Sequence, residues 1–79
     1  MARIIDGEKM NLIGKQVKKF RIEQNMSQQQ LSAKLETIAV YICRGSISRI
    51  EDQTRTVSDI ELWGLAQILD KPIQSFFEE

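Results

Sequence analysis

The sequence predicts an all-α fold, a compact bundle of five helices joined by short connections. Three observations indicate this fold. Apolar residues recur at intervals of three and four along most of the chain, two segments begin with a capping-box pattern, and Pro72 stands where one helix must stop and the next can begin. The 79 residues suffice for one domain, which we expect over residues 11–79 after an N-terminal arm at residues 1–10.

The first helix is expected to begin at Asn11, because asparagine is a favourable N-cap residue. It should close after Gln24, where Asn25 can adopt the left-handed conformation that ends many helices. Its inward face would consist of apolar residues at helical spacing, namely Leu12 or Ile13, Val17 and Phe20.

The second helix is predicted to begin at Ser27, which forms a capping box with Gln30, so that each side chain bonds the other residue's backbone N–H. Its inward face would consist of Leu31, Leu35 and Ile38. No Gly, Pro or Asn marks its end, and the β-branched and aromatic residues at 37–42 could also form a strand. Because a lone strand would have no partner, we expect the helix to end near Ala39 and a tight apolar turn to follow.

The stretch at 42–53 is predicted to form a short third helix whose Ile47 and Ile50 face the core. Its exposed face would carry two arginines and two small hydroxyl residues, namely Arg44, Ser46, Ser48 and Arg49. No bulky side chain stands between them, which suits a face that enters a groove and contacts phosphates and base edges. A solvated helix face is the alternative interpretation of the same pattern.

A second capping box, Ser58 with Glu61, predicts the start of a fourth helix. Its apolar residues are expected to be largely buried, namely Ile60, Leu62, Leu65, Ala66 and Leu69, with Trp63 at the margin. Pro72 would end this helix and begin the last one, at residues 73–77.

The formal net charge is zero, which argues against nucleic-acid binding if only the total is considered. The charges are, however, unevenly distributed. Residues 9–22 carry only basic charges, namely Lys9, Lys15, Lys18, Lys19 and Arg21, whereas residues 57–79 carry Asp59, Glu61, Asp70, Glu78 and Glu79 against Lys71. One positive and one negative face would orient the molecule on a polyanion.

Composition argues against several classes of function. The chain has one cysteine and no histidine, so we expect no internal disulfide, no zinc site and no histidine-based catalytic dyad. No nucleophile, base or metal cluster can be assembled, so we expect no enzyme, no cofactor and no small-molecule ligand. The lack of a long apolar run and of a signal-peptide pattern predicts a cytoplasmic protein that does not contact a membrane.

Two strings along the second and third helices carry a resemblance to a known family. Ser-Gln-Gln-Gln-Leu-Ser-Ala-Lys-Leu at 27–35, followed by Ile-Cys-Arg-Gly-Ser-Ile-Ser-Arg-Ile-Glu at 42–51, resembles the helix-turn-helix of the Cro and C1 repressor family, also called the XRE family. The resemblance extends over about residues 13–77. It implies a lambda-repressor-like DNA-binding domain whose third helix lies in the major groove of double-stranded DNA.

The resemblance also implies roles for individual residues. Base contacts are implied for Arg44, Gly45, Ser46 and Arg49. Phosphate contacts are implied for Ser27, Gln28 and Gln29 at the start of the second helix, and are further expected from Arg21, Ser48 and Arg55. Arg21 and Glu51 match a pair that joins the first helix to the third, where a carboxylate would hold the guanidinium beside the phosphates.

Four departures from the family pattern bear on the site. The connection from Leu35 to Ile47 is about five residues longer than the family's turn, which would change the angle between the two helices and the register of the base-contacting residues. Ser32 replaces a small apolar residue, and Cys43 stands at the N-cap of the third helix, where cysteine caps poorly. Gln53 stands where glycine is common, and because a left-handed glutamine costs about 1 kcal/mol, we expect this helix to end differently.

The leading hypothesis is a sequence-specific DNA-binding regulator, a repressor that acts as a homodimer on a two-fold site. A dimer is expected because one recognition helix reads only a few base pairs. Candidate dimer contacts are Ile73, Phe76 and Phe77, of which one phenylalanine is expected to close the core instead. The alternative is an antitoxin or adaptor-like protein-interaction module on the same fold, with weak or no DNA binding, which the neutral net charge favours.

Overall fold

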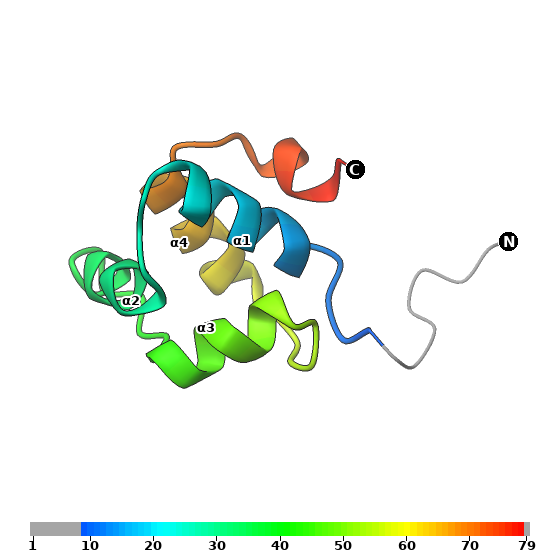
Figure 1. Ribbon diagram of the computed structural model, residues 1–79, viewed down its shortest axis with the longest axis horizontal. Helices are drawn as coiled ribbons and strands as arrows, with labels where there is room; N and C mark the ends of the chain where they lie inside the picture. Colours follow the sequence, from blue (N-terminus) through cyan, green and yellow to red (C-terminus); the bar gives the residue numbers. More distant parts are fainter. Residues whose placement is uncertain (1–8, 79) are drawn as a thin grey trace, which may run out of the picture.

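The computed structural model of the protein describes residues 9–78, so most of the predicted arm, residues 1–8, lies outside the described part of the chain. Within residues 9–78 lie four α-helices and one 3-10 helix (Figure 1): α1 (Gly14–Glu23), α2 (Gln28–Glu36), α3 (Arg44–Glu51), α4 (Asp59–Leu69) and η1 (Ile73–Phe77). The predicted all-α fold is confirmed, and the strand alternative at 37–42 is wrong. Five α-helices is also wrong, because the five residues after Pro72 form a short 3-10 helix.

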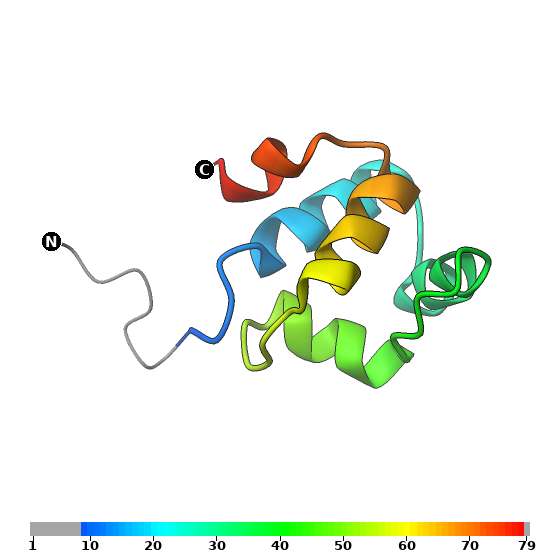
Figure 2. The ribbon, with the colours of Figure 1, turned by 180° about the vertical axis from the view of Figure 1, so that it is seen from behind.

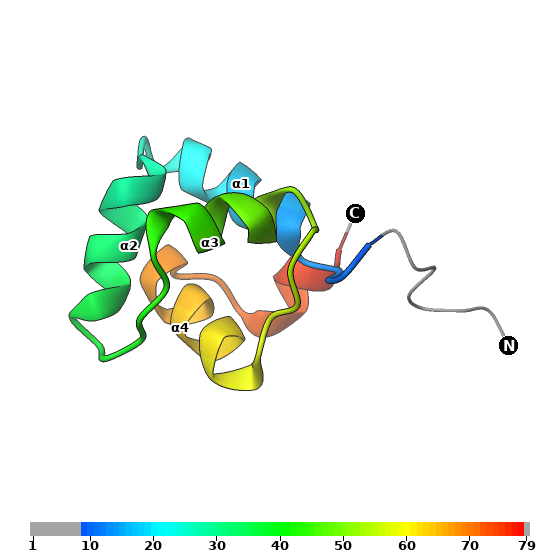
Figure 3. The same cartoon turned by 90° about the horizontal axis from the view of Figure 1, so that it is seen from below.

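The helices pack so that α3 forms one edge of the molecule. α1 contacts α3, α4 and η1, and α2 contacts α3 and α4. α3 is the lowest helix in Figure 1, and the view from behind in Figure 2 shows α1 and α4 above it. Seen from below in Figure 3, α2 crosses the start of α3, with its N-terminus on one side and the 37–43 turn on the other. One long face of α3 is therefore not covered by any other helix of residues 14–77.

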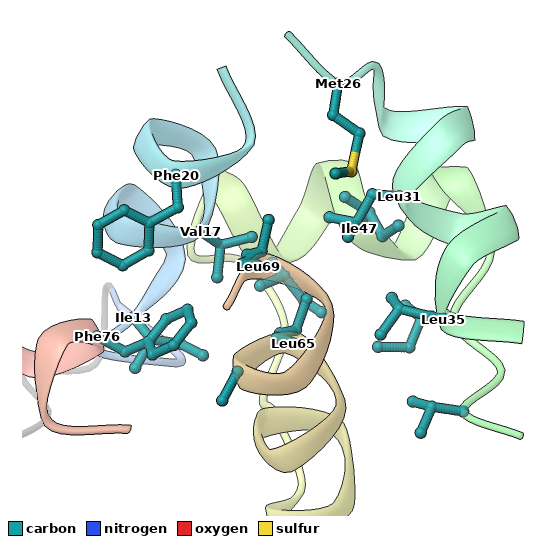
Figure 4. Packing of buried hydrophobic residues seen from close by; sticks show 14 residues of the cluster. Ile13, Val17, Phe20, Met26, Leu31, Leu35, Ile47, Leu65, Leu69 and Phe76 are labelled. Carbon is teal, nitrogen blue, oxygen red and sulfur yellow. The ribbon is translucent and has the colours of Figure 1, made fainter. Parts of the chain in front are cut away.

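The core lies between the four α-helices and is closed by η1 (Figure 4). Its largest fully buried side chains are Val17, Leu31, Leu35, Ile47, Ile50, Leu65, Leu69 and Phe76. Phe20 and Phe76 pack edge to face with ring centroids 5.2 Å apart. At the start of α1, Ile13 is buried and Leu12 is 43% exposed. The expectation for Ile60 is wrong: this residue is 65% exposed, because it lies on the side of α4 opposite the fully buried Leu69.

The start of α1 also differs from the prediction. Ile13, not Asn11, is the N-cap residue, and its side chain makes no cap. Asn11, two residues before Ile13, caps the helix instead. Its Oδ1 accepts hydrogen bonds from the backbone N–H groups of Ile13 at 3.1 Å and Gly14 at 2.8 Å. Its Nδ2 donates to the carbonyls of Ile50 at 3.1 Å and Arg55 at 2.8 Å. Asn11 therefore joins the start of α1 to the end of α3.

All four α-helices of the described chain end in the same way, with a non-glycine residue in the left-handed conformation. These residues are Asn25, Ala39, Gln53 and Asp70, with φ of 55°, 62°, 63° and 54°. In each case the N–H of the left-handed residue bonds the carbonyl three positions earlier, and the next N–H bonds the carbonyl five positions before itself. This Schellman pattern satisfies carbonyls that the helix leaves unpaired.

Two predictions about helix ends need correction. α2 ends at Glu36, earlier than expected, because the chain leaves the helix before Ala39 turns left-handed. The expectation that α3 would end without a left-handed Gln53 is also wrong. The backbone carbonyl of Gln53 accepts a hydrogen bond from the Met10 N–H at 2.9 Å, and the side-chain Nε2 of Gln53 donates one to the Asn11 carbonyl at 3.1 Å. These bonds offset the strain of the left-handed conformation.

The turn between α2 and α3, residues 37–43, is packed against the rest of the chain. Val40 and Ile42 are 4% and 3% exposed. Gly64 of α4 leaves room for Val40, since a Cβ built on Gly64 would lie 2.9 Å from Val40 Cγ2. Ser32 of α2 donates its hydroxyl hydrogen to the Ile42 carbonyl at 2.7 Å. The lengthened turn is therefore docked on both α2 and α4.

Candidate nucleic-acid interface

α3 presents opposite faces to the core and to solvent. Ile47 and Ile50 are fully buried and anchor the helix. Its exposed or half-buried residues on the other side are Arg44, Gly45, Ser46, Ser48 and Arg49. The view in Figure 3 is onto this edge of the molecule. The structure thus places the four residues predicted to contact bases on the accessible part of one helix, with both guanidinium groups directed to solvent.

Cys43 is the N-cap residue of α3, and its side chain makes no cap hydrogen bond, so the prediction of a poor cap is confirmed. The exposed thiol instead donates to Ser46 Oγ at 3.3 Å, and Arg49 Nη2 donates to the same oxygen at 3.3 Å. The pKa of the Cys43 thiol is lowered, because the Ser46 hydroxyl and backbone N–H can donate hydrogen bonds to the deprotonated sulfur. The Arg49 contact is long for an N–H···O hydrogen bond, which leaves the guanidinium available to other acceptors.

Arg21 of α1 and Glu51 of α3 form a bidentate ion pair, with Nε 2.7 Å from Oε2 and Nη2 3.0 Å from Oε1. The Glu51 side chain is 2% exposed, and its Oε1 also accepts the side-chain amide of Gln28 at 3.1 Å. The hydrogen bond to Glu51 raises the pKa of Arg21. Three helices therefore meet at one buried carboxylate, which fixes α3 relative to α1 and α2.

The same contacts limit what Arg21 offers to a ligand. Its remaining nitrogen, Nη1, donates to the Met26 carbonyl at 2.8 Å, and its side chain is 11% exposed. All three guanidinium nitrogens are thus engaged within the protein. The geometry favours a positioning role for Arg21 over the direct phosphate contact that the sequence analysis expected.

The start of α2 lies beside the accessible part of α3. Both bonds of the capping box predicted for Ser27 and Gln30 are present, which confirms it. Ser27 and Gln29 are exposed, whereas Gln28 is half-buried and held by Glu51. A helix N-terminus with exposed polar side chains attracts anions, because its free N–H groups and its dipole favour negative charge.

Arg55 follows α3 and is less available than the sequence analysis expected. Its guanidinium donates to Oε1 and Oε2 of Glu61 at 3.0 and 2.8 Å, and to the Thr56 carbonyl at 2.9 Å. This pairing lowers the pKa of Glu61 and raises that of Arg55. The Arg55 side chain is 28% exposed. A phosphate would therefore have to compete with Glu61 for this residue.

Sequence reasoning missed Tyr41, which lies two residues before Cys43 and is 75% exposed. The one available signal was the alternation of Val40, Tyr41 and Ile42, which directs the middle side chain away from its neighbours in a non-helical segment. This signal is weak, because all three residues are apolar or aromatic and the run is equally typical of one apolar turn.

The predicted dimer contacts differ in exposure. Phe76 is fully buried against Phe20, so it closes the core and cannot meet a partner, which corrects its assignment. Ile73 and Phe77 are 43% and 52% exposed. Phe77 also borders a surface groove of about 420 Å³ that Leu12 lines from the start of the domain.

Within residues 9–78, no helix has the length and apolar character needed to cross a membrane. The same residues contain no group of three or more His, Cys, Asp or Glu side chains able to hold a metal ion.

Comparison with known proteins agrees with this geometry. A search of curated proteins found none that matches the chain. The model of a family described as Helix-turn-helix matches residues 17–76, a span that contains α2, the 37–43 turn, α3 and α4 in full. The chain therefore belongs to the Cro/C1-type helix-turn-helix family, a family of DNA-binding regulators.

Proposed function

We propose that the protein is a sequence-specific regulator of transcription, a repressor, that reads the major groove of double-stranded DNA with α3. The observation that carries the proposal is the exposure of Arg44 and Arg49 on a helix whose Ile47 and Ile50 are fully buried. Arginine suits a base reader, because its planar fork can meet O6 and N7 of guanine together. Gly45 adds an open stretch of backbone, since a Cβ there would find only Arg49 Nη1, at 3.9 Å.

Phosphate contacts are proposed from the start of α2 and from α3 itself. Ser27 and Gln29 are exposed beside the first-turn N–H groups of α2, which suit a phosphate. Gln28 uses one amide hydrogen on Glu51 and retains a second for DNA. Ser48 is half-buried next to Arg49 and offers a small hydroxyl donor.

We further propose that two copies bind a two-fold site whose half-sites are one helical turn, or about 34 Å, apart. α3 has eight residues, enough to read only a few base pairs, which is too little for a specific site in a genome. Ile73 and Phe77 are exposed apolar residues of η1 and are the candidates for contact between the copies.

Selection of bound duplexes from a random pool tests the proposal. We expect an enriched palindromic sequence, bound with an affinity that falls steeply with salt because phosphate contacts release counterions. Arg49→Ala should weaken binding to that sequence by about tenfold or more and relax the base preference at one position. If no sequence is enriched and association does not depend on salt, the proposal is wrong.

Lys19→Ala is the matched control for charge. Lys19 lines a hollow with Phe20 and Lys71, on the side of α1 that faces η1 rather than α3. Its removal changes the net charge by the same amount as Arg49→Ala and should leave base preference unchanged. Equal losses in the two variants would mean that total charge, not contact by α3, controls binding.

A second candidate function is favoured by exposed apolar residues on α4. Ile60 and Trp63 lie three residues apart on this helix and are 65% and 46% exposed. With a neutral net charge, this face fits an antitoxin or adaptor-like module that binds another protein. Such a module would lose partner binding on Ile60→Ser, keep it on Arg49→Ala, and give no enriched duplex.

A further inference from the structure

Tyr41 is the most exposed large apolar side chain in the described part of the chain, at 75%. Its position is fixed by its neighbours, because Val40 is packed on Gly64 of α4 and Ile42 is 3% exposed. Within residues 9–78 the Tyr41 phenol has no hydrogen-bond partner. The domain thus presents a polar donor to solvent from a docked turn, and a tyrosine on a fixed backbone has only two side-chain torsions to order when it binds a ligand.

The turn places Tyr41 beside one particular side of α3. Tyr41 borders a surface hollow together with Glu36 of α2 and Ser46 of α3. Glu51 faces the start of α2, where it accepts the Gln28 amide. Because Ser46 and Glu51 are five residues apart, they face different sides of a helix that turns by about 100° per residue. Figure 3 shows the same relationship, with the start of α2 and the turn on opposite sides of α3.

A helix that lies in the major groove has a phosphate backbone on each of its two sides. This step rests on the proposed function. With α3 in the groove, the start of α2 faces one backbone and Tyr41 faces the other. We propose that Tyr41 is an additional DNA contact, whose phenol O–H donates a hydrogen bond to a phosphate oxygen of the backbone on the side away from the start of α2.

The chemistry of the position suits this donor. Tyrosine is one of the residues that hydrogen-bond phosphate oxygens and thereby set the register of a protein on DNA without reading sequence. A lysine or arginine at 41 would be drawn to the carboxylate of Glu36, which lines the same hollow. A neutral phenol avoids that competition. The lengthened turn thereby adds to the interface a second point of attachment, across α3 from Ser27 and Gln29.

Tyr41→Phe and Tyr41→Ala test the contact on the duplex recovered from the random pool. Both should weaken binding by about three- to tenfold, the effect of one lost hydrogen bond. The loss should be the same on an unrelated duplex, and the salt dependence should be unchanged because no charge is removed. Trp63→Phe, a change at another exposed aromatic residue, should bind as the wild type does. The melting temperatures should match, since Tyr41 packs little.

A direct measurement uses the fact that the chain contains one tyrosine. Incorporated 3-fluorotyrosine therefore reports on Tyr41 alone, and its fluorine NMR signal should shift when DNA is added. Single methylphosphonate substitutions should include one position that weakens the wild type and has no further effect on Tyr41→Phe, because the hydrogen bond is already absent.

The outcomes separate this inference from the proposed function. A wild-type protein that binds no duplex overturns both. A wild type that binds, with Tyr41→Phe equally tight or the fluorine signal unmoved, overturns the Tyr41 contact and leaves the proposed function standing. A loss only in Tyr41→Ala would show an apolar contact, and a changed base preference would show a base contact. Either result would contradict the phosphate assignment.

Discussion

A Cβ atom on Gly14 would lie 2.0 Å from the carbonyl oxygen of Ile50, closer than any side-chain atom can stand. The backbone at the start of α1 thus touches the end of α3. Asn11 donates to the same carbonyl at 3.1 Å, so the contact is reinforced by a buried hydrogen bond. The end of the proposed recognition helix is held by a residue that must lack a side chain.

We expect Gly14→Ala to lower the free energy of unfolding by about 2 to 3 kcal/mol, because the backbone of Ile50 must move to admit the methyl group. Gly45→Ala is the matched control, since it adds the same group to α3 in open space. It should raise the free energy of unfolding by about 0.5 to 1 kcal/mol through helix propensity. Urea denaturation measures both, and effects of the same sign would argue against the close contact.

Arg21→Ala should destabilise the fold by about 3 to 5 kcal/mol, because it leaves the Glu51 carboxylate buried without its partner. The double variant Arg21→Met with Glu51→Leu should be markedly more stable than Arg21→Ala, since no buried charge remains. Thermal unfolding of the wild type, the single variant and the double variant checks the order of their stabilities. A double variant no better than the single one would show that packing around the pair, rather than the unpaired charge, sets the cost.

The Arg55–Glu61 ion pair should make the free energy of unfolding depend on pH. Its hydrogen bonds hold the pKa of Glu61 below the ordinary value of 4.5. The pair's contribution is therefore present above pH 4.5 and is lost as the pH falls through the lowered pKa of the folded protein. Glu61→Gln keeps an oxygen for the Ser58 N–H, so its deficit in stability should be clear at about pH 7 and shrink at about pH 3. A deficit that does not vary with pH would contradict this account.

Ala39→Gly should stabilise the protein by up to about 1 kcal/mol, because glycine adopts a positive φ without steric cost. Ala33→Gly, the same exchange at an exposed position inside α2, should destabilise it by about 1 kcal/mol. Urea denaturation gives both values. Losses of similar size at the two positions would mean that Ala39 is not strained in solution.

Features that depend on neighbours in the sequence could be predicted. The capping boxes are examples, since Ser27 and Gln30 satisfy each other from three residues apart. The helix ends were harder, because Ala39 and Gln53 occupy positions where glycine gives the usual signal. The left-handed conformation of Gln53 is stabilised by tertiary hydrogen bonds with Met10 and Asn11, which the local sequence does not reveal.

Long-range contacts explain what the sequence did not reveal about the candidate site. The exposed face of α3 can be predicted from the periodicity of its own residues. Whether Arg55 is available to a phosphate cannot be predicted in this way, because it depends on how the loop after α3 brings Arg55 to Glu61. The docking of the turn depends likewise on Val40 meeting a glycine more than twenty positions away, at Gly64. The exposure of Tyr41 follows from the burial of both of its neighbours, which likewise depends on long-range packing.

The meeting of α1, α2 and α3 at the Glu51 carboxylate has a consequence for how this domain can change. Since Arg21 and Gln28 hold α3 directly, its orientation does not rely on the length of the segment that links it to α2. Substitutions at the exposed position 41 should therefore leave the orientation of α3 unchanged, whereas the buried Val40 and Ile42 on either side fix where that side chain lies.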